Sequence, residues 1–174
     1  MVGTIIGLTE RFTSIALTGT GGVGKTSIVL TVLDDYRIKQ RFGDNRSFIR
    51  CDQLTTSHTY LLRKLSEVTG AGVENPEDLS SLRRYLSSKE MIVVLDNVES
   101  ILGPPEMSAQ GIHSIVDELS RFSNICLVFT SRASNSLPTH CEIIEVPTLP
   151  MEADMKHFIE YTGSGNDRTR STRS

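Results

Sequence analysis

The 174-residue sequence lacks the features that mark membrane, secreted and nucleic-acid-binding proteins. No apolar run approaches the ~20 residues of a membrane-spanning helix. The amino terminus has neither the basic start nor the long apolar core of a secretory signal. The formal net charge is −3, so no excess of basic residues indicates a nucleic-acid or membrane surface. These absences predict a cytoplasmic protein with no membrane segment and no direct nucleic-acid signal.

Cysteine is also scarce, which bears on disulfides and metal sites. The three cysteines, Cys51, Cys126 and Cys141, show no C-x-x-C spacing, and each lies in or beside an apolar run. This pattern favours buried free thiols in a reducing compartment over a disulfide framework or a metal site.

The clearest motif that is present lies at residues 19–26, which match G-x-x-x-x-G-K-[ST] at every fixed position. A short apolar segment, 13–18, precedes it, and a helix-length apolar segment, 27–33, follows. Glycines let consecutive backbone N–H groups surround a phosphate, and the following helix points its positive end at the same anion. We therefore predict a phosphate-binding loop. Its candidate nucleotide-binding residues are Gly19, Thr20, Gly21, Gly22, Val23, Gly24, Lys25, Thr26 and Ser27.

Two side chains of this loop have specific predicted roles. Lys25 supplies a cation for phosphate, and we expect its ammonium group to face solvent when no anion is present. The hydroxyl of Thr26 is a candidate Mg²⁺ ligand.

The rest of the chain alternates predicted strands with predicted helices. This order predicts an α/β fold: a three-layer P-loop NTPase domain with a doubly wound parallel five-stranded sheet. The predicted strands are residues 13–18, 46–51, 91–96, 124–130 and 142–146. The predicted helices are residues 27–33, 58–69, 79–86 and 108–122, with a charged turn at 39–45.

The same reading divides the chain into segments. Residues 1–12 form a lead-in with a short strand at 4–6, and residues 13–149 form the nucleotide-binding domain. Residues 150–162 begin a truncated helical lid. Residues 163–174 hold no apolar side chain, so we expect a disordered tail.

Three further residues complete the predicted catalytic set with Lys25. Asp96 ends an apolar strand, where a Walker B acid holds Mg²⁺. Asn97 follows it, and an amide orients water but takes no proton at neutral pH, which predicts slow hydrolysis. Arg132, after the fourth strand, can reach a γ-phosphate. The chain has no N-K-x-D tetrad, so ATP or ADP is favoured over GTP.

Several segments together resemble a known family. G-T-G-G-V-G-K-T, F-I-R-C-D, V-V-L-D-N-V-E-S, L-V-F-T-S-R and V-P-T-L-P-M-E-A are similar to the NB-ARC and NACHT-like domains of STAND signal-transduction ATPases, as in fungal NOD-like receptor proteins. The resemblance implies an AAA+-like P-loop domain with an ADP-bound resting state, ATP exchange and homo-oligomerisation. It implies that Asp96 is the Walker B acid and Arg132 the sensor arginine, and it relates Arg50 to an arginine after the second strand.

Three functions follow as alternatives. The first is an ATP- or ADP-binding switch module, with Mg²⁺ and at most slow ATP hydrolysis. The second is an enzyme similar to small-molecule or nucleoside kinases, which share the loop but need an arginine-rich lid. The third is a non-functional truncated fragment that folds poorly: the chain leaves the family pattern near Tyr161, and the missing lid leaves the mouth of the site uncovered.

Overall fold

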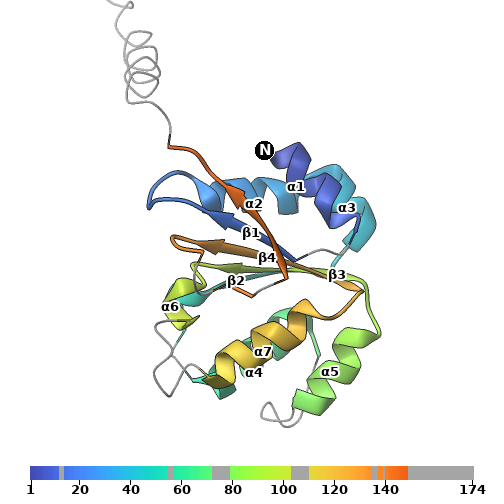
Figure 1. Cartoon of the computed structure of the whole chain (residues 1–174). Coiled ribbons are helices and arrows are strands. Elements are labelled where there is room, and N and C mark those ends of the chain that lie inside the picture. The colour runs from blue at the N-terminus through green and yellow to red at the C-terminus, as the bar shows by residue number, and fades with distance from the viewer. Residues whose placement is uncertain are drawn as a thin grey trace, which may run out of the picture.

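A five-stranded sheet, with helices on both faces, forms the centre of the protein (Figure 1). The computed structural model describes residues 1–11, 14–54, 57–71, 79–102, 110–134, 137–138 and 140–148. All strands run parallel in the order β2-β3-β4-β1-β5. This arrangement confirms the predicted doubly wound sheet. The strands are β1 (Ser14–Thr18), β2 (Arg46–Arg50), β3 (Met91–Asp96), β4 (Ile125–Ser131) and β5 (Cys141–Glu145).

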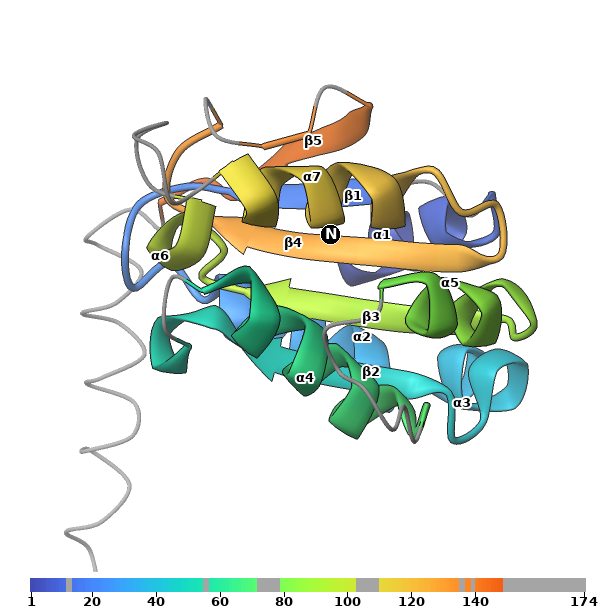
Figure 2. The same cartoon turned by 90° about the horizontal axis from the view of Figure 1, so that it is seen from below.

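The helices divide between the two faces of the sheet, as Figure 1 shows. One face carries α1 (Val2–Thr9), α2 (Lys25–Asp34) and α3 (Tyr36–Phe42). The other carries α4 (His58–Thr69), α5 (Leu79–Ser87), α6 (Glu99–Leu102) and α7 (Gln110–Ser120), with a 3₁₀ turn at Cys51–Gln53. In Figure 2 the arrowheads of β2, β3 and β4 point toward the same edge of the sheet, next to α6. The loop between β1 and α2 lies at this edge.

Side chains of the inner strands alternate between two hydrophobic clusters. In β3, Ile92 and Val94 pack with the α1–α3 side, whereas Val93 and Leu95 pack with the α4–α7 side. Every residue of β1, β3 and β4 is buried, because helices cover both faces of these strands. The edge strand β5 is mostly exposed or half-buried. The interior of the sheet therefore gives the loops at its carboxyl edge a rigid support.

The amino-terminal segment differs from its prediction. Residues 2–9 form a helix, where a short strand at 4–6 was predicted. Ile5, Ile6 and Thr9 are buried on one side of α1, which packs against α2. The strand prediction was wrong because Gly3 and Gly7 weaken the helical signal, while the buried positions i, i+1 and i+4 fit a helix once a surface is available to pack against.

The predicted charged turn at 39–45 is also corrected. The helix α3 continues through Phe42, and Ile38 and Phe42, four residues apart, are both buried. Asp35 caps its amino end by accepting a hydrogen bond from the Arg37 backbone N–H at 2.9 Å. Of the charges that suggested a turn, Lys39 is exposed on this helix, Arg41 is half-buried, and Asp44 follows the end of the helix.

Other predictions of secondary structure are confirmed. The helix at 58–69 has the predicted bounds and ends at Gly70, whose φ is +69°. Among the described residues, no helix is long and apolar enough to cross a membrane. The predicted lid at 150–162 and tail at 163–174 lie outside the described residues.

Candidate functional site

The glycine-rich loop takes a backbone conformation that few other residues adopt. The φ values of Gly19, Gly22 and Gly24 are +145°, +84° and +90°. A side chain at these positions would strain the backbone. Gly24 is also the N-cap of α2, so the positive end of the helix dipole lies at the loop. This combination of turned backbone and helix terminus is suited to bind an anion.

The start of the loop is held against the end of β5. A Cβ atom on Gly19 would lie 2.7 Å from the Val146 carbonyl oxygen. The Val146 N–H in turn donates to the Thr18 carbonyl at 2.8 Å. Because only glycine allows this approach, the sequence motif and the packing of β5 depend on the same residue.

The side chain of Lys25 does not face solvent, contrary to the sequence-based expectation. It is only 6% exposed, and its Nζ donates to the carbonyls of Gly19 at 2.6 Å and Thr20 at 2.9 Å. An ammonium group has three donors, so one remains for a phosphate oxygen. The lysine therefore ties the loop together while staying available to an anion.

Burial also changes the acidity of this lysine. Desolvation is the largest cause and lowers the pKa of Lys25, and Arg132 acts in the same direction. The carboxylates of Glu99 and Asp96 oppose the shift. A partly desolvated cation next to turned backbone amides gains more from a bound anion than an exposed lysine does.

The loop and the end of β3 meet through a hydroxyl and a carboxylate. Thr26 Oγ1 donates to Asp96 at 3.0 Å from Oδ1 and 3.1 Å from Oδ2, although the two residues are 70 positions apart. Asp96 is 1% exposed. Oxygen ligands from one carboxylate and one hydroxyl suit Mg²⁺, which in nucleotide sites keeps several waters and phosphate oxygens. The two predicted metal ligands thus fit this ion.

Sequence reasoning missed Thr130, which orients Asp96. Its hydroxyl donates to Asp96 Oδ1 at 2.6 Å and accepts from the Asn97 backbone N–H at 2.9 Å. Thr130 is fully buried, and Asn97 has a φ of +55°. The available signal was a polar residue at the end of an otherwise apolar strand. The turn that carries Asn97 is therefore fixed by the neighbouring strand.

Arg132 extends across the loop from the end of β4. Its Cζ lies 3.8 Å from the position that a Cβ on Gly21 would occupy. Its Nε is 3.5 Å from Oε1 of Glu99, a residue of α6. The other oxygen, Oε2, is buried and has no hydrogen-bond partner among the described residues. The predicted sensor arginine thus lies at the loop, paired with a carboxylate.

Two hollows adjoin the loop. One has a volume of about 270 Å³, and its walls come from the loop, Asn97 and Arg132. The second, of about 600 Å³, lies between the start of the loop, the segment after β4, and β5. Residues lining the first are Gly21, Gly22, Gly24, Lys25, Thr26, Ser27, Asn97 and Arg132. Those lining the second are Thr18, Gly19, Thr20, Arg132, Ala133, Ser134, Ile143 and Glu145.

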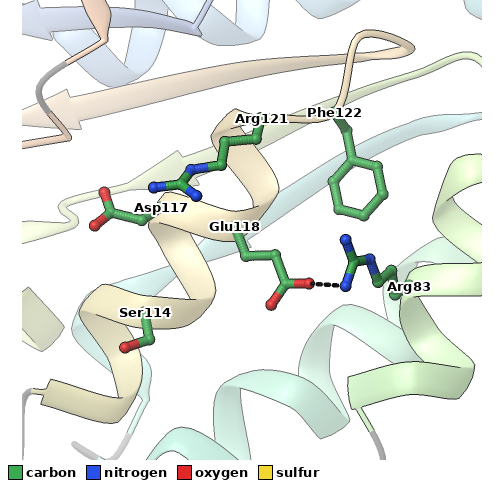
Figure 3. Close-up of a pocket in the computed structure, with 6 residues that line it drawn as sticks. All are labelled: Arg83, Ser114, Asp117, Glu118, Arg121 and Phe122. Carbon is green, nitrogen blue, oxygen red and sulfur yellow. Dashed lines mark ion pairs between the residues drawn. The ribbon is translucent and has the colours of Figure 1, made fainter.

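Two predicted residues have other surroundings. Val23 is partly buried and packs with the hydrophobic cluster on the α1–α3 face. Arg50 forms an ion pair with Asp52 at 2.8 Å and does not line either hollow. A third hollow, between α5 and α7, contains Arg121 and none of the predicted site residues (Figure 3).

The parallel sheet, the glycine loop at its carboxyl edge and the Thr26–Asp96 contact define a P-loop nucleotide-binding fold. Residues 5–138 match the NB-ARC domain, which is most of the chain. The chain therefore belongs to the NB-ARC domain family, and this part of the resemblance is confirmed. No curated protein matches the sequence.

Solved structures share the fold at low identity. The ORC1 protein of Aeropyrum pernix in complex with DNA has a TM-score of 0.67 and 16% identity, over 94% of this chain and 48% of that one. The Cdc6p protein of Pyrobaculum aerophilum has a TM-score of 0.66 and 14% identity, over 94% of this chain and 48% of that one. The Walker-type ATPase paby2304 of Pyrococcus abyssi has a TM-score of 0.63 and 13% identity, over 93% of this chain and 57% of that one. The chain thus spans about half the length of these structures.

Proposed function

We propose that the chain binds ATP or ADP with Mg²⁺ and serves as the nucleotide switch module of a cytoplasmic signalling ATPase of the STAND class, in which a longer relative forms homo-oligomers. The observation that carries the proposal is the contact between Thr26 and Asp96. It brings together the two oxygen ligands that a P-loop protein needs for its metal. Membership of the NB-ARC family and the P-loop fold support the same function.

Binding divides between the backbone of the loop and the side chains of Lys25, Thr26, Asp96 and Thr130. The backbone amides between Gly19 and Gly24 surround the phosphates, and the free donor of Lys25 contacts one phosphate oxygen. Thr26 and Asp96 would hold Mg²⁺ through their side-chain oxygens, and the ion would neutralise phosphate charge. Thr130 orients Asp96 through its own hydrogen bond to Oδ1, which does not depend on the Thr26 hydroxyl.

Calorimetric titration with ADP, ATP and GTP, with and without Mg²⁺, tests the binding. We expect binding of ADP and ATP, stronger with Mg²⁺, and weak or no binding of GTP. In Lys25→Ala the loss of a charge-assisted contact weakens binding by about 1.5–3 kcal/mol. Lys39→Ala is the matched control, since Lys39 pairs with Asp34 on the exposed surface. Equal affinity in parent and Lys25→Ala would contradict the assignment of the loop, provided that thermal melts show both to be folded.

We infer that hydrolysis is slow because Asn97 stands where a carboxylate could act as a base. Asn97 lines the hollow next to Lys25 and Thr26, and an amide takes no proton at neutral pH. General-base help is worth about 10²–10⁴-fold. Asn97→Asp keeps the size and tolerates the positive φ, so we expect faster single-turnover cleavage of ATP with little change in affinity. An unchanged rate, with a parent that already turns over rapidly, would rule out this interpretation.

The kinase alternative gains no support from the described residues. A kinase lid needs arginines that close over the phosphates. Arg121, the single arginine of residues 97–123, lines the hollow between α5 and α7 and not the loop (Figure 3). The switch module remains the better account of the site.

A further inference from the structure

The ion pair between Glu99 and Arg132 places a carboxylate at the edge of an anion-binding loop. The guanidinium group extends from Glu99 toward Gly21, in the wall of the hollow that contains Lys25 and Thr26. Glu99 itself comes from α6, on the segment that follows β3 and Asp96. One arginine therefore lies between a protein carboxylate and the loop.

The carboxylate of Glu99 has few polar partners besides this arginine in the described part of the chain. Among the described residues, its Oε2 is buried without a hydrogen-bond partner, and Oε1 forms an ion pair with Arg132. A carboxylate in this position repels phosphate, and the arginine screens that repulsion. If Arg132 moves to a γ-phosphate, Glu99 loses this ion pair just as a further negative charge arrives.

We propose that Glu99 is a specificity-determining residue that competes with the γ-phosphate for Arg132 and thereby favours ADP over ATP. The inference rests on the proposed function, because it concerns the nucleotide preference of the same site. ADP has no γ-phosphate, so it leaves the Glu99–Arg132 pair intact. ATP must break the pair and also accept the nearby carboxylate.

Titration of Glu99→Gln with ATP and with ADP, in Mg²⁺, tests the competition. Glutamine keeps the shape and removes the charge, so Arg132 is released and the repulsion ends. We expect ATP affinity to rise about three- to tenfold, because a partly exposed pair contributes up to about 1 kcal/mol and the lost repulsion adds to it. ADP affinity should change less than about twofold, since its phosphates end farther from Glu99.

A double-mutant cycle with Arg132→Ala isolates the part of the Glu99→Gln effect on ATP affinity that depends on the arginine. In the Arg132→Ala background, Glu99→Gln should raise ATP affinity by no more than about twofold, because only direct repulsion remains. An equal gain in both backgrounds would overturn the competition. A loss of ATP affinity in Glu99→Gln would also overturn it, since it would mean that Glu99 positions Arg132 for the nucleotide.

The pair between Arg83 and Glu118 provides a matched control (Figure 3). Its side chains are 65% and 27% exposed, against 70% and 24% for Arg132 and Glu99. Glu118 lies near the end of α7, which leads to the amino end of β4, whereas the loop lies at the carboxyl edge. Glu118→Gln should leave both nucleotide affinities unchanged. A shift like that of Glu99→Gln would indicate a general effect of net charge and overturn the proposal.

Two further measurements separate the possible failures. Glu99→Ala removes the same charge, so it should give the same direction of change if Glu99→Gln folds poorly; thermal melts identify the folded variant. A parent that binds no nucleotide would overturn the proposed function and this inference with it. A parent that binds ATP and ADP with an affinity ratio that Glu99→Gln leaves unchanged would overturn the inference alone.

Discussion

Removal of the Thr130 hydroxyl tests how the end of β4 positions the carboxylate of Asp96, the proposed metal ligand. Thr130→Val keeps the branched shape but deletes the donor to Asp96 and the acceptor for the Asn97 N–H. Thr130 is fully buried and Asp96 is 1% exposed, so water cannot replace these contacts without rearrangement. The substitution therefore removes one of the hydrogen bonds that stabilise the buried carboxylate of Asp96.

The expected magnitude follows from the two lost contacts. A hydrogen bond to a charged group is worth about 1.5–3 kcal/mol, and a buried N–H without a partner adds to the loss. We expect Thr130→Val to lower the free energy of unfolding by about 2–4 kcal/mol, because Thr26 still donates to Asp96. For a domain of this size, such a change lowers Tm by about 5–15 °C.

Urea denaturation followed by circular dichroism measures the loss, with Thr130→Ser as the control. Serine keeps the hydroxyl and removes one methyl group, which lowers the stability by about 1 kcal/mol. Valine keeps more apolar volume than serine, so packing alone predicts that the valine variant is the more stable of the two, whereas the lost hydrogen bonds predict that it is the less stable. Hydrogen exchange of the Asn97 amide should accelerate in the valine variant and stay slow in the serine variant. A valine variant as stable as the serine variant would refute the reasoning.

Two other substitutions test separate parts of the site. We expect Gly19→Ala to destabilise the protein and to displace β5, because its Cβ would lie 2.7 Å from the Val146 carbonyl at a φ of +145°; urea denaturation and the exchange rate of the Val146 amide measure this. Slow exchange of that amide in a stable alanine variant would contradict the packing argument. We expect Arg132→Ala to narrow the difference between ATP and ADP affinity while ADP affinity stays nearly constant, because only ATP offers a γ-phosphate. Equal losses for the two nucleotides in calorimetry would place the arginine elsewhere.

The sequence was sufficient where a local pattern has one structural solution. Residues 19–26 require positive φ at glycine, and the structure has this at Gly19, Gly22 and Gly24. Apolar runs of strand length, alternating with helices, predicted the parallel sheet, because such strands need helices on both faces. The position of Asp96 beside the loop could be predicted because it ends the most apolar strand, and its contact with Thr26 agrees with that placement.

The sequence was insufficient where burial depends on a distant surface. The helices α1 and α3 form because Ile5, Ile6, Ile38 and Phe42 pack on a face of the sheet that no local pattern reveals. Likewise, the chain alone cannot show whether Lys25 faces solvent, since its two acceptors are carbonyls presented by the folded loop. Propensity near these residues was weak, and tertiary packing decided the outcome.

The sequence by itself determined the class of protein, because the phosphate loop and the order of strands are properties of contiguous segments. Only the tertiary structure decided which side chains of the site contact one another. Thr130 reaches Asp96 across 34 positions, and Glu99 and Arg132 come from segments that follow two different strands. Adjacent parallel strands bring these side chains together at one edge, and hydrogen bonds and ion pairs act only over a few ångströms. Such short-range contacts between residues far apart in the sequence depend on the fold. They correspond to no fixed spacing in the sequence, so no sequence pattern predicts them.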